Sequence, residues 1–221
     1  MVTLVLDLES SLLDSIPAIA ASLCHGINEA CGAAADEARI AELLRSGQLE
    51  ALRASLGERA FRAALRRGAA HYQRVGQFMA WPYIGVPAML SAPSKAGIGV
   101  VLVSRTPRAT LERIIDRWGL ELHAAHFDCP TLPAPAQDRR ERLAALVTKR
   151  AIDVRNATCL SDDPLDLECA EHLGIRPVFA AYGRLAWQVC RWDAGSVALS
   201  PDQVPRLVGM RHGEHLADPV N

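Results

Sequence analysis

Short apolar runs recur along the chain, and stretches with apolar residues at helical spacing separate most of them. The runs are Val2–Leu6, Ile98–Val103, Leu122–Phe127, Ala157–Leu160 and Pro177–Ala181. Uninterrupted runs of this length are typical of strands buried on both faces of a parallel sheet. Because helical stretches alternate with the later runs, the pattern predicts an α/β fold with a doubly wound parallel sheet.

Residues 16–81 interrupt this alternation. Helical spacing predicts three helices there, at Ile16–Cys31, Ala38–Leu56 and Glu58–Met79, the second interrupted near Gly47. A crossover between parallel strands needs only about a dozen residues or more, so this block is too long to be one. We therefore predict an inserted all-helical domain at residues 16–81. Residues 1–15 and 82–221 are expected to form the α/β core.

Turn signals mark the return to the core and the helix after the second strand. Trp81–Pro87 is rich in Pro and Gly, which predicts a loop, and a short helix is expected at Pro87–Ala96. Thr106 followed by Pro107 predicts an N-cap and a first helical residue. Gly119 is expected to end that helix.

Polar residues stand where the predicted strands end. Asp7 follows the first strand, Ser104 follows the second, and Asp162, Asp163 and Asp166 follow the fourth. Open α/β sheets bind ligands outside the carboxyl ends of their strands. We therefore expect these side chains to converge at one edge of the sheet.

Each of these polar residues has two interpretations. Asp7 could be a nucleophile or metal ligand, or it could cap a turn or helix. Ser104 could bind phosphate ahead of a helix N-terminus, or only shape the turn. The three acids after the fourth strand repel one another unless they share a cation, and oxygen ligands suit Mg²⁺. Alternatively, Asp162 or Asp163 caps the next helix.

Composition and charge narrow the function class. The chain has 221 residues, half of them hydrophobic, and a net charge of −1. The chain has no excess of basic residues, so its charge does not indicate nucleic-acid binding. The N-terminal run ends at Asp7 without a basic leader, and no apolar run is long enough to cross a bilayer, so we expect no membrane partner. Six cysteines without a CxxC pair indicate free thiols in the cytoplasm and no zinc site.

Three segments in order resemble the motifs of the haloacid dehalogenase superfamily of phosphatases, in its phosphoglycolate-phosphatase-like branch with a helical cap. The family's first motif, Asp-x-Asp-Gly-Thr-Leu-x-Asp-Ser, is similar to DLESSLLDS at residues 7–15. Residues 82–120 resemble the entry into the second motif, with Ser104 at its Ser/Thr position. Residues 159–175, CLSDDPLDLECAEHLGI, resemble the fourth motif, with Asp162 and Asp166 at its acids. The resemblance spans nearly the whole chain.

The resemblance implies a Mg²⁺-dependent hydrolase that acts on a small phosphorylated metabolite. Asp7 would attack phosphorus and form an aspartyl-phosphate, and Glu9 would stand at the position of the general acid and base. Mg²⁺ would be held by Asp7, the backbone carbonyl of Glu9, and Asp162, with Asp166 in support. The residues expected to bind phosphate are Ser10, Ser104, Arg105, Arg139 and Lys149. The cap would set substrate choice, and its candidate contacts, each with surface solvation as the alternative, are His25, Arg53, Arg62, Arg66, His71 and Tyr72.

The chain departs from the family pattern at positions within the catalytic motifs. Glu9 replaces the second aspartate, Ser10 and Ser11 replace Gly-Thr, and Ser161 replaces the glycine before Asp162. The third-motif lysine has no clear counterpart; Arg139 lines up with it, and Lys149 lies nearer the fourth strand. The extra methylene of Glu9 moves its carboxyl by about 1.5 Å, and a misplacement near 1 Å can cost about a hundredfold in rate.

These departures predict a slow or narrowly specific phosphatase. We expect the protein to be either a monomer or a homodimer. The alternative is a catalytically weakened or non-catalytic member of the same fold that binds a phosphorylated ligand or a protein partner. Dehalogenation is disfavoured, because that branch lacks the metal and does not need acids at positions 162 and 166.

Overall fold

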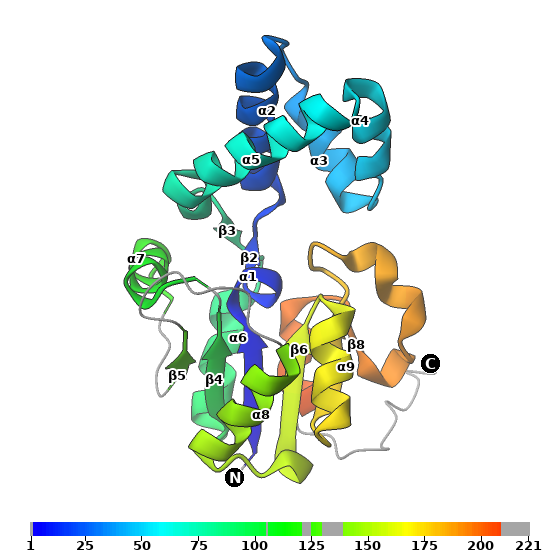
Figure 1. Ribbon diagram of the computed structural model, residues 1–221. Coiled ribbons are helices and arrows are strands. Elements are labelled where there is room, and N and C mark those ends of the chain that lie inside the picture. Colours follow the sequence, from blue (N-terminus) through cyan, green and yellow to red (C-terminus); the bar gives the residue numbers. More distant parts are fainter. Residues whose placement is uncertain (1, 105, 121–124, 130–138, 209–221) are drawn as a thin grey trace. The chain divides into compact units, whose positions relative to one another are not determined.

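The chain folds into two compact units in a computed structural model that describes residues 2–104, 106–120, 125–129 and 139–208. One unit comprises Met1–Leu12 and Tyr83–Asn221, and the other comprises Leu13–Pro82 (Figure 1). The helical insertion was expected at residues 16–81, so the second unit is slightly longer at both ends. Among the described residues, no helix is both long and apolar enough to cross a membrane.

The first unit is built on a parallel sheet in the order β5-β4-β1-β6-β7-β8. All neighbouring strands in it are parallel. The predicted doubly wound α/β fold is therefore confirmed. Its strands are β1 (Thr3–Asp7), β4 (Gly99–Val103), β5 (Ala125–Asp128), β6 (Ala157–Ser161), β7 (Arg176–Ala180) and β8 (Val197–Ala198).

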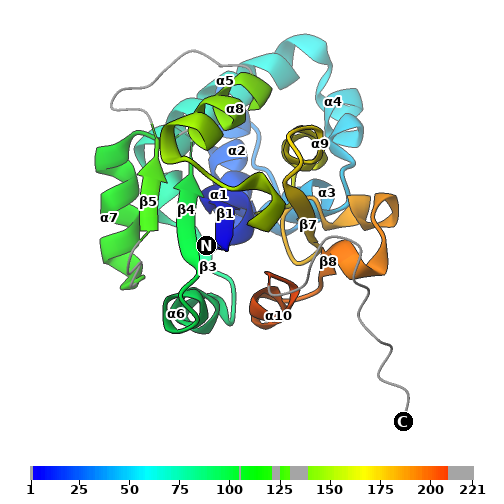
Figure 2. The ribbon, with the colours of Figure 1, turned by 90° about the horizontal axis from the view of Figure 1, so that it is seen from below.

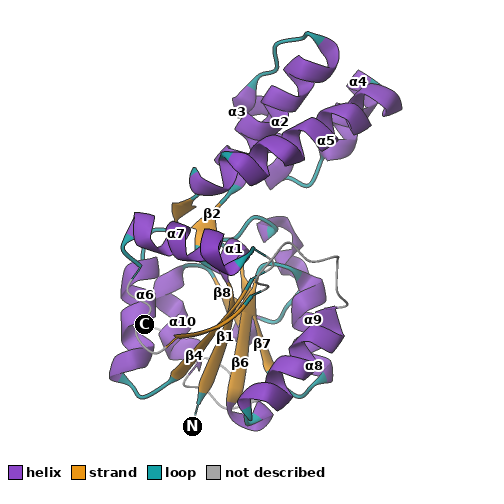
Figure 3. Ribbon diagram, turned by 60° about the vertical axis from the view of Figure 1, so that its left-hand side comes forward, coloured by secondary structure: helices purple, strands orange, loops and turns teal. Residues whose placement is uncertain are grey.

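Helices cover both faces of this sheet. Helices α6 (Val86–Lys95) and α10 (Val204–Val208) lie on one face, and α8 (Arg139–Arg150) and α9 (Pro164–His172) lie on the other (Figures 2 and 3). Because side chains alternate along a strand, Val5, Val101 and Cys159 all point toward α8 and α9 and share a core with Leu146 and Leu167.

The register of the central strands brings the predicted site residues to one edge. Asp7 pairs with Val103, and Leu6 pairs with Leu160. Ser104, which follows Val103, and Asp162, which follows β6, therefore flank the carboxyl end of β1 on its two sides.

The second unit is a small helical bundle. It contains α2 (Ile16–Cys31), α3 (Glu37–Arg45), α4 (Leu49–Leu56), α5 (Glu58–Arg74) and the 3₁₀ helix η1 (Gly76–Phe78). Helices α2 and α5 pack closely through glycines, since a Cβ on Gly26 would lie 2.2 Å from the carbonyl oxygen of Ala64. Side chains from α2 and α3, including Leu23, Ile27 and Ile40, form its core.

The second helical stretch of the insertion, expected at Ala38–Leu56 with an interruption near Gly47, is two helices, α3 and α4, with Gly47 between them, as predicted. Two other sequence predictions need correction. Trp81 and Pro82, expected in a loop, form β3, which pairs antiparallel with β2 (Leu13–Asp14). Thr106 is not a helix N-cap, because α7 (Arg108–Trp118) begins two residues later with Pro107 at the N-cap position. Gly119 ends α7 in the left-handed conformation, as predicted.

Candidate active site

Asp7 is the last residue of β1 and lies where the chain turns into α1 (Leu8–Ser11), a single helical turn. Its side chain makes no capping hydrogen bond to this turn, so the capping alternative for Asp7 is wrong. The carbonyl oxygen of Asp7 accepts a hydrogen bond from the hydroxyl of Ser11. The side chain is partly exposed, which leaves a carboxylate at the end of the central strand.

Glu9 reaches from α1 to the loop after β4. Its Oε1 accepts hydrogen bonds from the Oγ of Ser104, at 2.9 Å, and from the Oγ1 of Thr106. Ser104 is 1 % exposed, and its Oγ also accepts from the backbone N–H of Thr106, at 3.0 Å. Ser104 therefore shapes the turn and also binds the first motif. Thr106 belongs to this cluster, although the Thr-Pro signal had assigned it to a helix cap.

The acidic residues that follow β6 have different hydrogen-bond partners. The Oγ of Ser161 accepts from the N–H of Asp163, at 3.0 Å, and donates to Oδ2 of Asp166, at 3.3 Å. Asp163 caps α9 by accepting from the N–H of Leu165, at 3.1 Å. The N-cap alternative is therefore correct for Asp163 and not for Asp162.

Asp162 is completely buried. Its Oδ2 accepts from the N–H of Leu185, at 2.9 Å, but its Oδ1 has no hydrogen-bond partner among the described residues. Gly183 packs directly on it, since a Cβ there would lie 2.4 Å from the Cβ of Asp162. Burial raises the pKa of the Asp162 carboxyl to about 6, although the charge of Arg184 and the N–H of Leu185 oppose the rise.

A basic side chain from α8 reaches the strand ends, and it is Arg142. Its Nη2 donates to the carbonyl oxygen of Asp128, at 2.6 Å, and to that of Ser104, and its Nε lies 3.4 Å from Oδ2 of Asp128. Sequence reasoning missed Arg142. It lies four residues before the buried Leu146, a spacing that places both on one helix face. Arg139 has the same spacing from the buried Leu143, so this signal alone does not select Arg142.

Of the residues predicted to bind phosphate besides Ser104, Lys149 is the one whose side chain the structure describes. Lys149 is exposed in the last turn of α8, about 10 Å farther along the helix axis than Arg142. Arg105 and the side chains of Ser10 and Arg139 lie outside the described residues.

The predicted metal ligands can be tested for their fit to Mg²⁺. In the described part of the chain, no three or more His, Cys, Asp and Glu side chains form a group that could hold a metal ion. The side chain of Glu9 is directed at hydroxyls, so only its backbone carbonyl could serve as a ligand. A set made of Asp7, that carbonyl and Asp162 uses only two side chains. The partnerless Oδ1 of Asp162 is a buried, hard oxygen donor, and a cation would compensate it.

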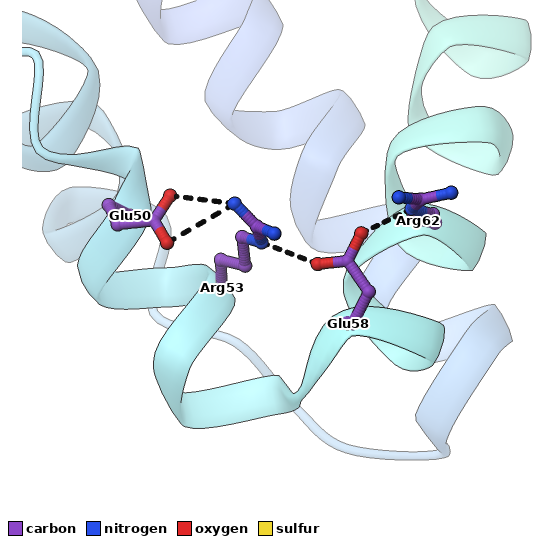
Figure 4. Close-up of polar contacts among 4 residues, drawn as sticks. All are labelled: Glu50, Arg53, Glu58 and Arg62. Atoms are coloured by element: carbon purple, nitrogen blue, oxygen red, sulfur yellow. Dashed lines mark hydrogen bonds and ion pairs between the residues drawn. The ribbon is translucent and has the colours of Figure 1, made fainter.

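Two arginines of the helical unit that were predicted to contact substrate, Arg53 and Arg62, form ion pairs within that unit. Arg53 of α4 pairs with Glu50 and with Glu58 of α5, and Glu58 also pairs with Arg62 (Figure 4). These side chains are largely exposed, so Arg53 and Arg62 form a solvated ion-pair chain between two helices.

The histidines of this unit are packed together. The rings of His25 and His71 lie 4.3 Å apart, and Nδ1 of His71 is 3.0 Å from the Oγ of Ser22. Partial burial, followed by the nearby His25 and Arg74, lowers the pKa of His71.

Comparisons with known proteins give the fold a wider context. No protein-family model matches the chain. A curated relative, the N-acetylmuramic acid 6-phosphate phosphatase of Pseudomonas aeruginosa, is 25% identical in an alignment of 190 residues that covers 80% of each chain.

Two solved structures are similar over most of the chain. One is a predicted phosphoglycolate phosphatase from Haemophilus somnus, with a TM-score of 0.71, 16% identity, and coverage of 93% of this chain and 96% of that one. The other is a haloacid dehalogenase-superfamily hydrolase of subfamily IA from Geobacter sulfurreducens, with a TM-score of 0.64, 16% identity, and coverage of 95% and 97%. All three of these proteins are named as phosphatases or hydrolases.

Proposed function

The chain has the fold of the haloacid dehalogenase superfamily, and from this premise we propose that it is a phosphatase acting on a small phosphorylated metabolite. The observation that carries the proposal is the β4-β1-β6 strand order, which puts Asp7 between Ser104 and Asp162 at one sheet edge. A carboxylate nucleophile can form an aspartyl-phosphate, hydroxyl donors can bind the phosphoryl oxygens, and a buried carboxylate can hold a cation that neutralises their charge.

In this proposal Asp7 attacks phosphorus in line, the alcohol leaves, and water then cleaves the aspartyl-phosphate. Ser104 donates to the phosphoryl oxygens, helped by backbone amides near Ser10. Asp7, the carbonyl of Glu9 and Asp162, with Asp166 behind them, would hold Mg²⁺. When bound, the ion would supply charge neutralisation between the attacking carboxylate and the phosphoryl oxygens.

Glu9 limits the rate in this proposal. Its carboxylate holds the hydroxyls of Ser104 and Thr106, whereas acid–base catalysis requires it to be within hydrogen-bond reach of the leaving or attacking oxygen. We therefore expect a slow or narrowly specific enzyme. The first substrates to test are N-acetylmuramic acid 6-phosphate and phosphoglycolate, since the names of the relative and of the structural neighbour contain them.

The test is phosphate release from a panel of phosphomonoesters with Mg²⁺ present. Asp7→Asn should abolish release, because an amide is a poor nucleophile. Asp202→Asn, which changes an exposed aspartate in the same unit, is the matched control and should keep full activity. If the wild-type protein releases no phosphate from any ester, or if Asp7→Asn remains active, the proposal is wrong.

A non-catalytic binding protein is the second candidate, and two contacts favour it. Glu9 is engaged by two hydroxyls, and Asp162 is covered by Gly183 and the N–H of Leu185. Beryllofluoride separates the candidates, because it forms a stable phosphoryl mimic on a reactive aspartate. Stabilisation of the wild type, but not of Asp7→Asn, would support the enzyme.

We place the protein in the cytoplasm as part of the same proposal. All six of its cysteines are free thiols, a state that reducing compartments maintain.

A further inference from the structure

The loop after β4 presents two hydroxyls to a single oxygen atom. Ser104 and Thr106 both donate to Oε1 of Glu9. Hydrogen bonds with an ionised acceptor are about twice as strong as neutral ones. Two side-chain donors converging on one anionic oxygen are the local arrangement of an anion-binding site.

Ser104 makes a second hydrogen bond within the turn. Its Oγ accepts from the N–H of Thr106, at 3.0 Å. A serine hydroxyl has one proton to donate, and Ser104 donates it to Glu9. The turn therefore uses an acceptor site of this hydroxyl and leaves its proton for an anion.

The backbone of this loop is held without help from Glu9. The N–H of Ser104 donates to the carbonyl oxygen of Asp128, at 3.2 Å, and the carbonyl of Ser104 accepts from Arg142. Arg142 also holds Asp128 through its carbonyl and carboxylate. Both ends of Ser104 are thus fixed to β5 and α8, and removing the Glu9 carboxylate leaves these contacts in place.

We propose that Thr106 joins Ser104 in binding the substrate phosphate, and that Glu9 occupies this pair of hydroxyls as an internal carboxylate which substrate phosphate must displace. The inference rests on the proposed function, because it assigns the phosphoryl group of that substrate to these donors. It adds Thr106 to the site. It also makes Glu9 a competitor of the substrate in this conformation, which is a physical reason to expect slow turnover from a chain that retains Asp7.

The test is the affinity of the full chain for inorganic phosphate, measured by isothermal titration calorimetry without Mg²⁺. Glu9→Ala should bind phosphate about tenfold more tightly than the wild type, the equivalent of one hydrogen bond to a charged group. Glu9→Gln should fall between them, since a neutral amide oxygen competes more weakly. Glu171→Gln, at an exposed position on α9, is the matched charge control and should equal the wild type.

Variants of Thr106 test whether the gain in phosphate affinity comes from freeing the hydroxyls of Ser104 and Thr106 or only from removing the negative charge of Glu9. In the Glu9→Ala background, Thr106→Val should remove most of the gain and Thr106→Ser should keep it. Unchanged affinity in Glu9→Ala overturns the proposal, and so does a gain that survives Thr106→Val. Far-ultraviolet circular dichroism on each variant verifies that it is folded.

The proposed function can fail separately from this inference. A wild-type protein that hydrolyses no ester, with the gain present in Glu9→Ala and absent with Thr106→Val, overturns the phosphatase and supports the anion pair. Robust hydrolysis with no Glu9 dependence of phosphate affinity supports the phosphatase and overturns the anion pair.

Discussion

The segments that follow β4 and β6 use the same local structure for opposite chemistry. At each strand end a serine, Ser104 directly after β4 and Ser161 as the last residue of β6, has an Oγ that accepts from the N–H two residues later, at 3.0 Å in both cases. Each serine also donates to a carboxylate, which is Glu9 for Ser104 and Asp166 for Ser161. After β4 the side chains that surround the turn are donors, whereas after β6 they are acceptors.

The difference lies in what remains uncompensated. The hydroxyls after β4 are satisfied by Glu9, which comes from a segment distant in the sequence. After β6 a buried acceptor, Oδ1 of Asp162, has no partner in the described residues, and burial without a partner disfavours the charged form. We therefore expect the end of β4 to bind anions and the end of β6 to bind a cation, with Asp7 between them.

The largest expected effect comes from removing the acceptor at the end of β6. Asp162→Asn should lower Mg²⁺-dependent phosphate release by about a thousandfold, because a bound metal contributes several kcal/mol to transition-state stabilisation. Phosphate affinity measured without Mg²⁺ should stay close to that of the wild type, since the anion pair lies at the end of β4. Loss of both properties would contradict the division between the two segments.

The second prediction concerns pH and stability without divalent cations. The pKa of Asp162 is raised from 3.8 to about 6 in the folded protein. Between these values the folded state binds more protons than the unfolded state, so stability falls as pH rises. The loss from pH 4 to pH 7 should be about 2 kcal/mol.

Urea unfolding at several pH values measures this slope. It can be followed by tryptophan fluorescence, to which Trp192, stacked on Phe179 at 6.1 Å, contributes together with the other three tryptophans. Asp162→Asn should flatten the slope, whereas the exposed Asp202→Asn should leave it unchanged. A slope that is the same in Asp162→Asn and wild type would assign the effect to another group.

The third prediction tests the packing that covers Asp162. Gly183→Ala places a Cβ 2.4 Å from the Cβ of Asp162, and overpacking of this kind should cost about 2 kcal/mol of unfolding free energy. The clash involves the two Cβ atoms, so the same substitution should cost much less in an Asp162→Gly background. Additive costs in this double-mutant cycle would argue against the contact.

The smallest expected effect is at the end of β4. Thr106→Val removes a hydroxyl bonded to partly exposed Glu9, which should cost about 1 kcal/mol. Thr106→Ser keeps the hydroxyl and should be nearly neutral. Urea unfolding of the two variants checks the difference, and equal stability would mean that this contact contributes nothing.

The elements of the fold could be predicted because their signals are local. Val2–Leu6 and Ile98–Val103 read as buried strands since their apolar residues are uninterrupted, and α2 was predicted with its observed ends because Gly32 terminates it in the left-handed conformation. A prediction was wrong where one sequence signal is compatible with two local structures. Thr106-Pro107 resembles a helix start, yet tertiary contact with Glu9 takes the hydroxyl and α7 starts later.

The candidate site was predictable as a set of strand ends but not as a set of contacts. Asp7, Ser104 and Asp162 were selected because parallel strands share one carboxyl edge. Arg142 was missed in favour of Arg139 and Lys149, because a helical pattern gives the spacing of a basic residue and not which carbonyl it reaches. Asp162 and Asp163 could not be told apart as caps, since both precede α9.

The chain alone therefore determined the α/β architecture, the helical insertion and the positions of the polar residues, since these follow from periodicity and turn chemistry between near neighbours. Only the tertiary structure decided that Glu9 accepts hydrogen bonds from the hydroxyls of Ser104 and Thr106. It also decided that Arg142 donates to the loop after β4 and that Gly183 packs against the buried Asp162. Such contacts join segments far apart in sequence. Which of them form depends on strand order, register and burial, because these set the distance and the dielectric surroundings of each charged group.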